Sequence, residues 1–221
     1  MNIFVSNDDG INSYGIKVLI DILKNYGEVY VSAPNEEKSG AGCSIKFNYI
    51  DPLVIDDKTV VFNCPPASCT EFGFKYFKDI DFDLCVTGIN NGYNGSMYSL
   101  MSGTFGASLM ATFIKPDIKS IIMSADVDDQ NIYLKARNAI DYILKNDLLS
   151  ISSIISVNLC SKEYPSELGF KVGKMYNSYN HILNDDEDYK LISLGYTSLT
   201  PIKNNLMDDS KIEILNEKVS R

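Results

Sequence analysis

Apolar and polar positions alternate along this chain in blocks that suit strands followed by helices. Apolar runs of strand length occupy residues 2–6, 28–33, 83–88, 120–125 and 154–159. Between them, apolar residues recur at the i, i+3, i+4, i+7 spacing of an amphipathic helix, at Ile16, Leu19, Ile20 and Leu23 and within residues 67–78, 102–114 and 131–145. Strands that alternate with helices predict parallel pairing with helices on both faces. The predicted fold class is a doubly wound α/β sheet.

The pattern changes after residue 160. Residues 161–175 have room for one short strand, residues 184–190 are predicted to be a solvated acidic loop, and residues 194–202 are predicted to be extended. We therefore expect an α/β domain over residues 1–160. Residues 161–221 form a C-terminal extension that is expected to pack on this core or on a partner subunit. The only histidine, His181, is expected on the surface of the extension.

Composition narrows the class of protein. A chain of 221 residues with 45% hydrophobic and 22% charged residues is typical of one main globular domain. Acidic residues outnumber basic ones, 29 to 20, without a lysine or arginine cluster, which argues against binding to a nucleic-acid polymer. Neither a signal sequence nor an apolar run of membrane-spanning length is evident, and the five cysteines form no C-x-x-C pair. We expect a cytoplasmic protein with no membrane association.

Polar loops follow three of the predicted strands. They span residues 7–10, 33–42 and 88–96. Because ligands of open α/β sheets bind at the carboxyl ends of the strands, we expect these loops to meet in one site.

The first loop places two carboxylates, Asp8 and Asp9, side by side. Such a pair either begins an ordinary turn at Gly10 or binds a divalent cation. Ser39 and Asn90 in the later loops add a hydroxyl and an amide oxygen, so an all-oxygen site for one Mg or Mn ion is predicted. With a single histidine in the chain, a histidine-rich zinc centre is excluded.

The triplet Ser102-Gly103-Thr104 opens a predicted helix. Free amide groups and the helix dipole at such a position favour an anion such as phosphate. The alternative is an ordinary N-cap, which is the commoner role of such a triplet.

Four motifs resemble the SurE family of metal-dependent 5'/3'-nucleotidases. They are NIFVSNDDGINSYGI, VSAPNEEKSGAG, DLCVTGINNGYNGS and SGTFGASLMA, in the family's order and at similar spacing over residues 1–125, with a further match in GYTSLTPI at 195–202. The resemblance implies a Rossmann-like, mostly parallel sheet with a C-terminal excursion, and hydrolysis of nucleoside monophosphates. It places the metal ligands at Asp8, Asp9, Ser39 and Asn90, and the surroundings of the substrate phosphate at Asn94, Ser102, Gly103 and Thr104.

The chain departs from the family pattern in two places. Residues 63–69, NCPPASC, replace a Gly-Thr-Pro-x-Asp-Cys-like stretch, and the segment before GYTSLTPI is shorter than usual. Because the family's oligomer contacts lie in its C-terminal part, we expect a homodimer, with a tetramer as the other possibility.

The predicted reaction is metal-assisted hydrolysis of a phosphomonoester, with Asp8 or Asp9 accepting the proton of the attacking water. Two other α/β classes fit less well. A receiver domain needs an acceptor aspartate after its third strand, which residues 60–64 do not provide, and a dinucleotide-dependent oxidoreductase needs G-x-G-x-x-G, which the first loop lacks. A non-catalytic nucleotide- or phosphate-binding module is the remaining alternative.

Overall fold

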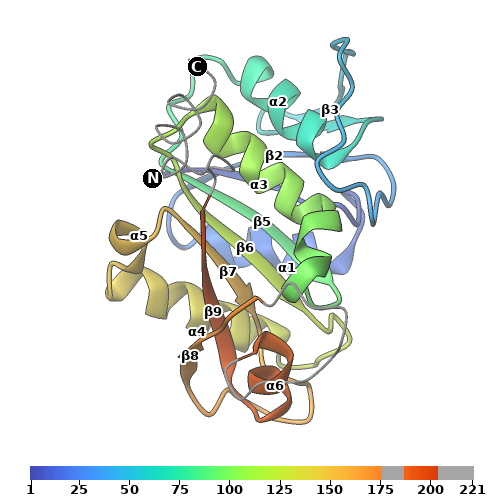
Figure 1. Cartoon of the computed structure of the whole chain (residues 1–221). Helices are drawn as coiled ribbons and strands as arrows, with labels where there is room; N and C mark the ends of the chain where they lie inside the picture. Colours follow the sequence, from blue (N-terminus) through green and yellow to red (C-terminus); the bar gives the residue numbers. More distant parts are fainter. Residues whose placement is uncertain (176–186, 204–221) are drawn as a thin grey trace, which may run out of the picture.

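The computed structural model describes residues 1–175 and 187–203, and it is an α/β sandwich built on one sheet (Figure 1). The strands are β1 Asn2–Ser6, β2 Glu28–Pro34, β3 Leu53–Asp56, β4 Thr59–Phe62, β5 Leu84–Asn91, β6 Lys119–Ala125, β7 Ile154–Asn158, β8 Phe170–Val172 and β9 Thr197–Ile202. The helices are α1 Tyr14–Leu23, α2 Pro66–Tyr76, α3 Gly103–Ile114, α4 Ile132–Lys145, α5 Leu148–Ile151 and α6 Asp188–Ser193, with a 3-10 helix η1 at Ser96–Met101.

The sheet runs in the order β3-β4-β2-β1-β5-β6-β7-β9-β8. All pairs from β4 through to β7 are parallel, whereas β3 and β9 join the two ends of this block in antiparallel pairs. The predicted doubly wound, mostly parallel sheet is therefore confirmed. The order reverses at β1, which places its carboxyl end beside those of β2 and β5, where ligands of such sheets bind.

Alternate residues of β1 build the two layers of the core. Ile3 and Val5 point into the cluster that contains the apolar faces of α1 and α4, while Phe4 points into an aromatic-rich cluster with Phe62 and Phe72. Figure 1 shows α3 in front of the sheet and α1 behind it. Both faces are thus covered, as near-continuous apolar strands require.

The C-terminal part adds to the sheet. Strand β9 pairs with β7 along its length, and the short strand β8 predicted within residues 161–175 pairs with β9. The prediction of a solvated acidic loop over residues 184–190 is wrong for its described part, because Asp188 begins helix α6 and is fully buried. Hydroxyl groups of β9 supply the hydrogen bonds that make this burial possible, as described below. His181 lies outside the described residues.

One strand at the far edge, β3, did not stand out in the sequence as a member of the sheet. Strands β3 and β4 form an edge hairpin, in which every residue of β3 is exposed while Val60, Val61 and Phe62 of β4 are buried. An edge strand with both faces exposed has no apolar alternation to reveal it.

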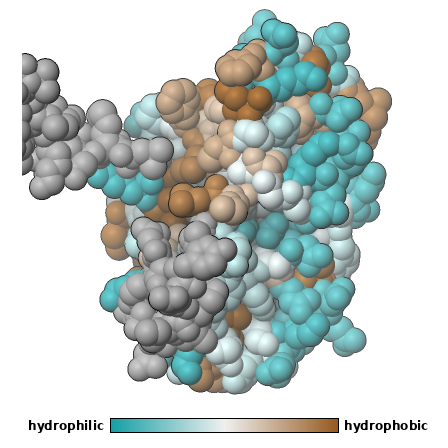
Figure 2. Space-filling model, turned by 45° about the vertical axis from the view of Figure 1, so that its right-hand side comes forward, coloured by the Kyte–Doolittle hydropathy of each residue, from teal (hydrophilic) through white to brown (hydrophobic). Residues whose placement is uncertain are grey.

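The surface carries several large apolar side chains. Phe47 and Phe113 are 90% and 84% exposed, and Figure 2 shows hydrophobic side chains gathered on the face that it presents, with hydrophilic ones along its right-hand edge. Within residues 1–175 and 187–203, no helix is long and apolar enough to cross a membrane.

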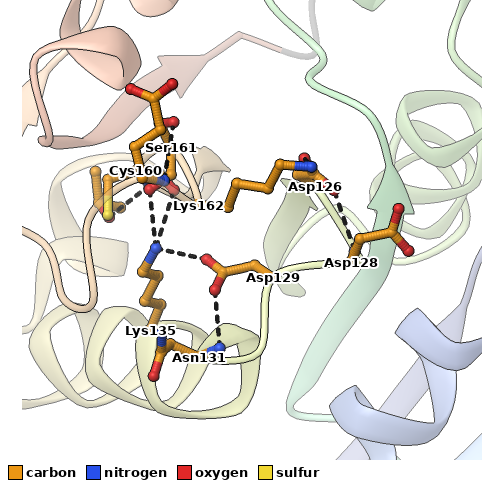
Figure 3. A network of polar contacts seen from close by, with 10 residues as sticks. Asp126, Asp128, Asp129, Asn131, Lys135, Cys160, Ser161 and Lys162 are labelled. Atoms are coloured by element: carbon orange, nitrogen blue, oxygen red, sulfur yellow. Dashed lines mark hydrogen bonds and ion pairs between the residues drawn. The ribbon is translucent and has the colours of Figure 1, made fainter.

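A buried ion pair ties the loops after β6 and β7 to helix α4 (Figure 3). The Lys135 ammonium group, whose side chain is 0% exposed, pairs with Asp129 and also donates to the carbonyl oxygen of Ser161 at 3.0 Å. Asp129 in turn accepts a hydrogen bond from the backbone N–H of Asn131 at 2.8 Å. On the surface beside this pair, Lys162 contacts Asp126 at 2.8 Å. Three segments at one edge of the sheet are thereby held together.

Candidate functional site

The turn after β1 is shaped by Asn7 and Gly10. The buried Asn7 amide donates to the carbonyl oxygen of Gly10 at 2.9 Å and to the Ser13 hydroxyl at 3.0 Å. Gly10 has a φ of +88°, a conformation that residues with a Cβ rarely adopt. The chain can therefore turn immediately after two adjacent aspartates and present both at the sheet edge.

Asp8 is held by the first turn of α3. The residue is 2% exposed, and its carboxylate accepts a hydrogen bond from the Thr104 hydroxyl at 2.5 Å, while the backbone N–H groups of Gly103 and Thr104 also approach it. Burial raises the pKa of Asp8, and these hydrogen bonds oppose the rise. The amide groups that the sequence assigned to phosphate thus contact a carboxylate of the protein.

Asp9 points to the neighbouring side of the same edge. It accepts a hydrogen bond from the backbone N–H of Asn91 at 3.0 Å and lines a smaller depression together with Glu37. Burial raises the pKa of Asp9 to about 6, although the Asn91 hydrogen bond lowers it, and repulsion from Asp8 and Glu37 raises it further. A cation at this edge would relieve that repulsion.

The loop after β2 folds over Asp8 and delivers Ser39. The backbone N–H of Lys38 donates to the carbonyl oxygen of Asp8 at 2.7 Å, which fixes the loop against the first turn. The Ser39 hydroxyl donates to Glu37 at 2.9 Å, so its oxygen lone pairs remain available to a ligand.

Asn90 presents its amide oxygen to the same place. Its NH₂ group donates to the carbonyl oxygen of Gly92 at 2.7 Å, and its Oδ1 lies 3.4 Å from the Thr104 hydroxyl that contacts Asp8. Strand β5 changes register between Thr87 and Asn90, and this irregularity carries Asn90 toward the cleft.

Asn94 is fixed by the two following strands. Its backbone N–H and C=O both pair with the side-chain amide of Asn158, at 3.0 Å each, and its own amide donates to Ser124 at 3.0 Å. These buried bonds hold the loop after β5 against β6 and β7.

These groups, apart from Asp9, surround one cleft with a volume of about 370 Å³, which is within the range of small-molecule sites. Of the predicted site residues, the cleft is lined by Asp8, Ser39, Asn90, Asn94 and Ser102. Gly103 and Thr104 are buried behind Asp8 rather than in the lining, and Ser102 caps α3 by accepting a hydrogen bond from the N–H of Phe105 at 3.3 Å.

The donor set fits a hard divalent cation. Asp8 and Asp9 take part in no ion pair among the described residues, so two partly desolvated carboxylates meet without a positive partner. Over residues 1–175 and 187–203, no three His, Cys, Asp or Glu side chains are grouped so as to hold a metal ion. A cation here would depend on amide and hydroxyl oxygens besides the carboxylates, a set that suits Mg or Mn.

Comparison with known proteins gives the site a context. The family model described as "Survival protein SurE" matches residues 3–181 of the chain. The chain belongs to the SurE family. It is 30% identical over 253 aligned residues to a 5'-nucleotidase SurE of Clostridium botulinum (strain Alaska E43 / Type E3), with 98% of each chain covered.

A second SurE relative and a solved structure are also similar to this chain. A 5'-nucleotidase SurE of Xanthomonas axonopodis pv. citri is 32% identical over 184 residues, which cover 81% of this chain and 71% of that protein. The crystal structure of the SurE protein from Aquifex aeolicus superposes with a TM-score of 0.82 at 24% identity, covering 99% of this chain and all of that one, and so shows the same fold.

The aromatic part of the SurE cleft was not predicted from the sequence. Tyr93, Tyr98, Met101 and Tyr189 also line it. The first three lie in or just after the polar loop that follows β5, so the cluster GYNGSMYSLM could have suggested them. No sequence signal pointed to Tyr189, because it lies about a hundred residues further along the chain.

Gly103 provides a test of the local packing. A Cβ at this position would lie 2.8 Å from the Cβ of Asp8 and 2.9 Å from Pro66, so alanine must displace the carboxylate. We expect Gly103→Ala to lower turnover of a phosphomonoester by roughly tenfold, because small misplacements of reacting groups are costly. The measurement is phosphate release at saturating substrate together with the thermal midpoint. Unchanged turnover in a folded variant would show that Asp8 tolerates the shift.

Proposed function

We propose that this protein hydrolyses nucleoside 5'- and 3'-monophosphates to nucleoside and inorganic phosphate. The observation that carries the proposal is the convergence of Asp8, Ser39 and Asn90 on one cleft in a chain of the SurE family. The relatives named 5'-nucleotidase over most of the chain support the substrate class.

One divalent ion per subunit, Mg or Mn, is proposed to bind Asp8, Asp9, Ser39 and Asn90. When bound, such an ion offsets the negative charge of the phosphate and acidifies the attacking water. The proposal is supported by two carboxylates that form no ion pair within residues 1–175 and 187–203, and by the hydroxyl and amide oxygens of Ser39 and Asn90 in the same cleft as Asp8.

The remaining residues are proposed to hold the phosphate and to move the proton. Asn94 and Ser102 line the cleft, and Gly103 with Thr104 holds Asp8 from behind. Asp8 or Asp9 accepts the proton of the attacking water, since no histidine lies among residues 1–175 and 187–203.

The experiment is an assay of phosphate release from a panel of 5'- and 3'-nucleoside monophosphates, polyphosphate and an aryl phosphate. Activity with Mg or Mn that disappears in excess chelator, and returns when the ion is restored, is the expected result. Tight retention of nucleotide without any release of phosphate would instead identify a binding module. A metal-independent activity would contradict the proposed ligand set.

Two further properties belong to the same proposal. We propose a homodimer, with a tetramer as the other possibility, because the segment before GYTSLTPI is shorter than is usual in the family. A cytoplasmic location is supported by five cysteines that are all free thiols, a state that a reducing compartment maintains. Residues 1–160 are proposed as the catalytic unit, and residues 161–221 as an extension that packs on it.

A further inference from the structure

One part of the cleft is aromatic, in contrast to the polar groups that surround Asp8. Tyr93, Tyr98, Met101 and Tyr189 contribute to its lining. Tyr98 and Met101 are 52% and 58% exposed. Covering apolar surface of this size with a ligand lowers the free energy of the complex. The phosphate chemistry proposed above uses none of these four side chains.

Direct contacts bring Tyr189 of helix α6 next to the segment that carries Tyr93 and Tyr98. The Ser96 hydroxyl at the start of η1 donates to the Glu187 carboxylate next to α6, at 2.9 Å. The Tyr189 hydroxyl donates to the carbonyl oxygen of Tyr93 at 3.3 Å. Helix α6 is thereby attached to the loop that carries Tyr93 and Tyr98.

The ring of Tyr189 also depends on a glycine. A Cβ on Gly95 would lie 2.9 Å from Cε2 of the ring, so only glycine allows the ring to lie this close to the backbone.

Buried hydrogen bonds fix the helix that carries Tyr189. Asp188 is fully buried and accepts hydrogen bonds from the Ser198 hydroxyl at 2.5 Å and the Thr200 hydroxyl at 2.7 Å. A carboxylate with two such partners locks α6 onto β9. The ring of Tyr189 is therefore held in place before any ligand arrives, which lowers the entropic cost of binding.

We infer that Tyr98 and Tyr189 form a nucleobase subsite, in which the base of the substrate stacks on these rings while its phosphate lies toward Asp8 and Asn90. This inference rests on the proposed function. It assigns a binding place to the base, the part of the substrate that the polar half of the cleft does not contact. Stacking on an aromatic ring tolerates every base, because each base has a π-face. The subsite should therefore separate nucleotides from simple sugar phosphates more strongly than one base from another.

The test compares a nucleoside 5'-monophosphate with ribose 5-phosphate, which carries the same phosphate and sugar but no base. In Tyr98→Ala and Tyr189→Ala, KM for the nucleotide should rise by roughly tenfold, since stacking on one ring contributes about that factor. KM for ribose 5-phosphate should stay unchanged. Tyr98→Phe keeps the ring and should behave like the wild type for both substrates. Tyr76→Ala, which removes a partly exposed ring of α2 outside the cleft, is the matched control.

Two outcomes would overturn the subsite while leaving the phosphatase proposal intact. One is equal KM values of the wild-type enzyme for the nucleotide and ribose 5-phosphate, and the other is an equal loss on both substrates in the alanine variants. If the wild type hydrolyses neither substrate, the proposed function fails instead. Binding of the four free ribonucleosides, followed by NMR, then decides the subsite: binding that both alanine variants lose upholds it, and no binding to the wild type refutes it.

Discussion

Replacing Asp8 by asparagine is expected to lower phosphate release by on the order of a thousandfold, because a proposed cation ligand and its negative charge disappear together. The geometry around the side chain changes little. Asparagine keeps an oxygen that can accept the hydrogen bond of the Thr104 hydroxyl, and it has the same size. The measurement is the turnover number with Mg or Mn at saturating nucleotide.

The folded state should tolerate this change well. Burial raises the pKa of Asp8, which means that its charged form is destabilised in the protein when no cation is bound. Removing that charge is therefore expected to leave the urea midpoint of the metal-free protein unchanged or higher. Asp21→Asn, on the exposed surface of α1, is the matched control and should keep full activity. Near-normal turnover in Asp8→Asn would refute the assignment of Asp8 as a metal ligand.

Replacing Lys135 by methionine is expected to destabilise the fold by about 3–5 kcal/mol, the usual cost of leaving one partner of a buried ion pair uncompensated. Asp129 would remain almost fully buried with a negative charge, and the carbonyl oxygen of Ser161 would lose a hydrogen bond. The free energy of unfolding in urea measures the effect.

A control on the same helix separates charge from burial. Lys145 also pairs with an aspartate, Asp141, but its side chain is 74% exposed, so Lys145→Met should change the free energy of unfolding by less than about 0.5 kcal/mol. Adding Asp129→Leu to Lys135→Met should restore part of the lost stability, since no charge then remains buried. A Lys135→Met variant as stable as the wild type would show that water reaches Asp129.

The sequence predicted best those structural features that depend on residues adjacent in the chain. Apolar runs identify buried strands by themselves, and the turn residues of the first loop indicate where β1 ends. Because the loops of a doubly wound sheet meet at one edge, the sequence also predicted that Asp8, Ser39 and Asn90 lie in one cleft. The metal and phosphate roles of these residues stay predictions.

Features that depend on distant partners were not predictable in the same way. Asp188 has the local sequence of a solvated acidic loop, yet Ser198 and Thr200 bury it. The hydroxyl of Thr104 was expected near phosphate, but it contacts Asp8. Thr104 lies 96 residues after Asp8, and Ser198 and Thr200 lie 10 and 12 residues after Asp188 in another element, so no pattern local to either aspartate points to its partner.

The late position of Tyr189 in the chain has a consequence for synthesis on the ribosome. Asp8, Ser39 and Asn90 are made roughly a hundred residues or more before Tyr189, and growing chains fold from the amino end. The three residues of the oxygen-lined pocket are thus present in the nascent chain while the tyrosine of α6 has yet to be translated. Selectivity for nucleotides over other phosphate esters would be acquired last, when β9 emerges and draws α6 against the cleft.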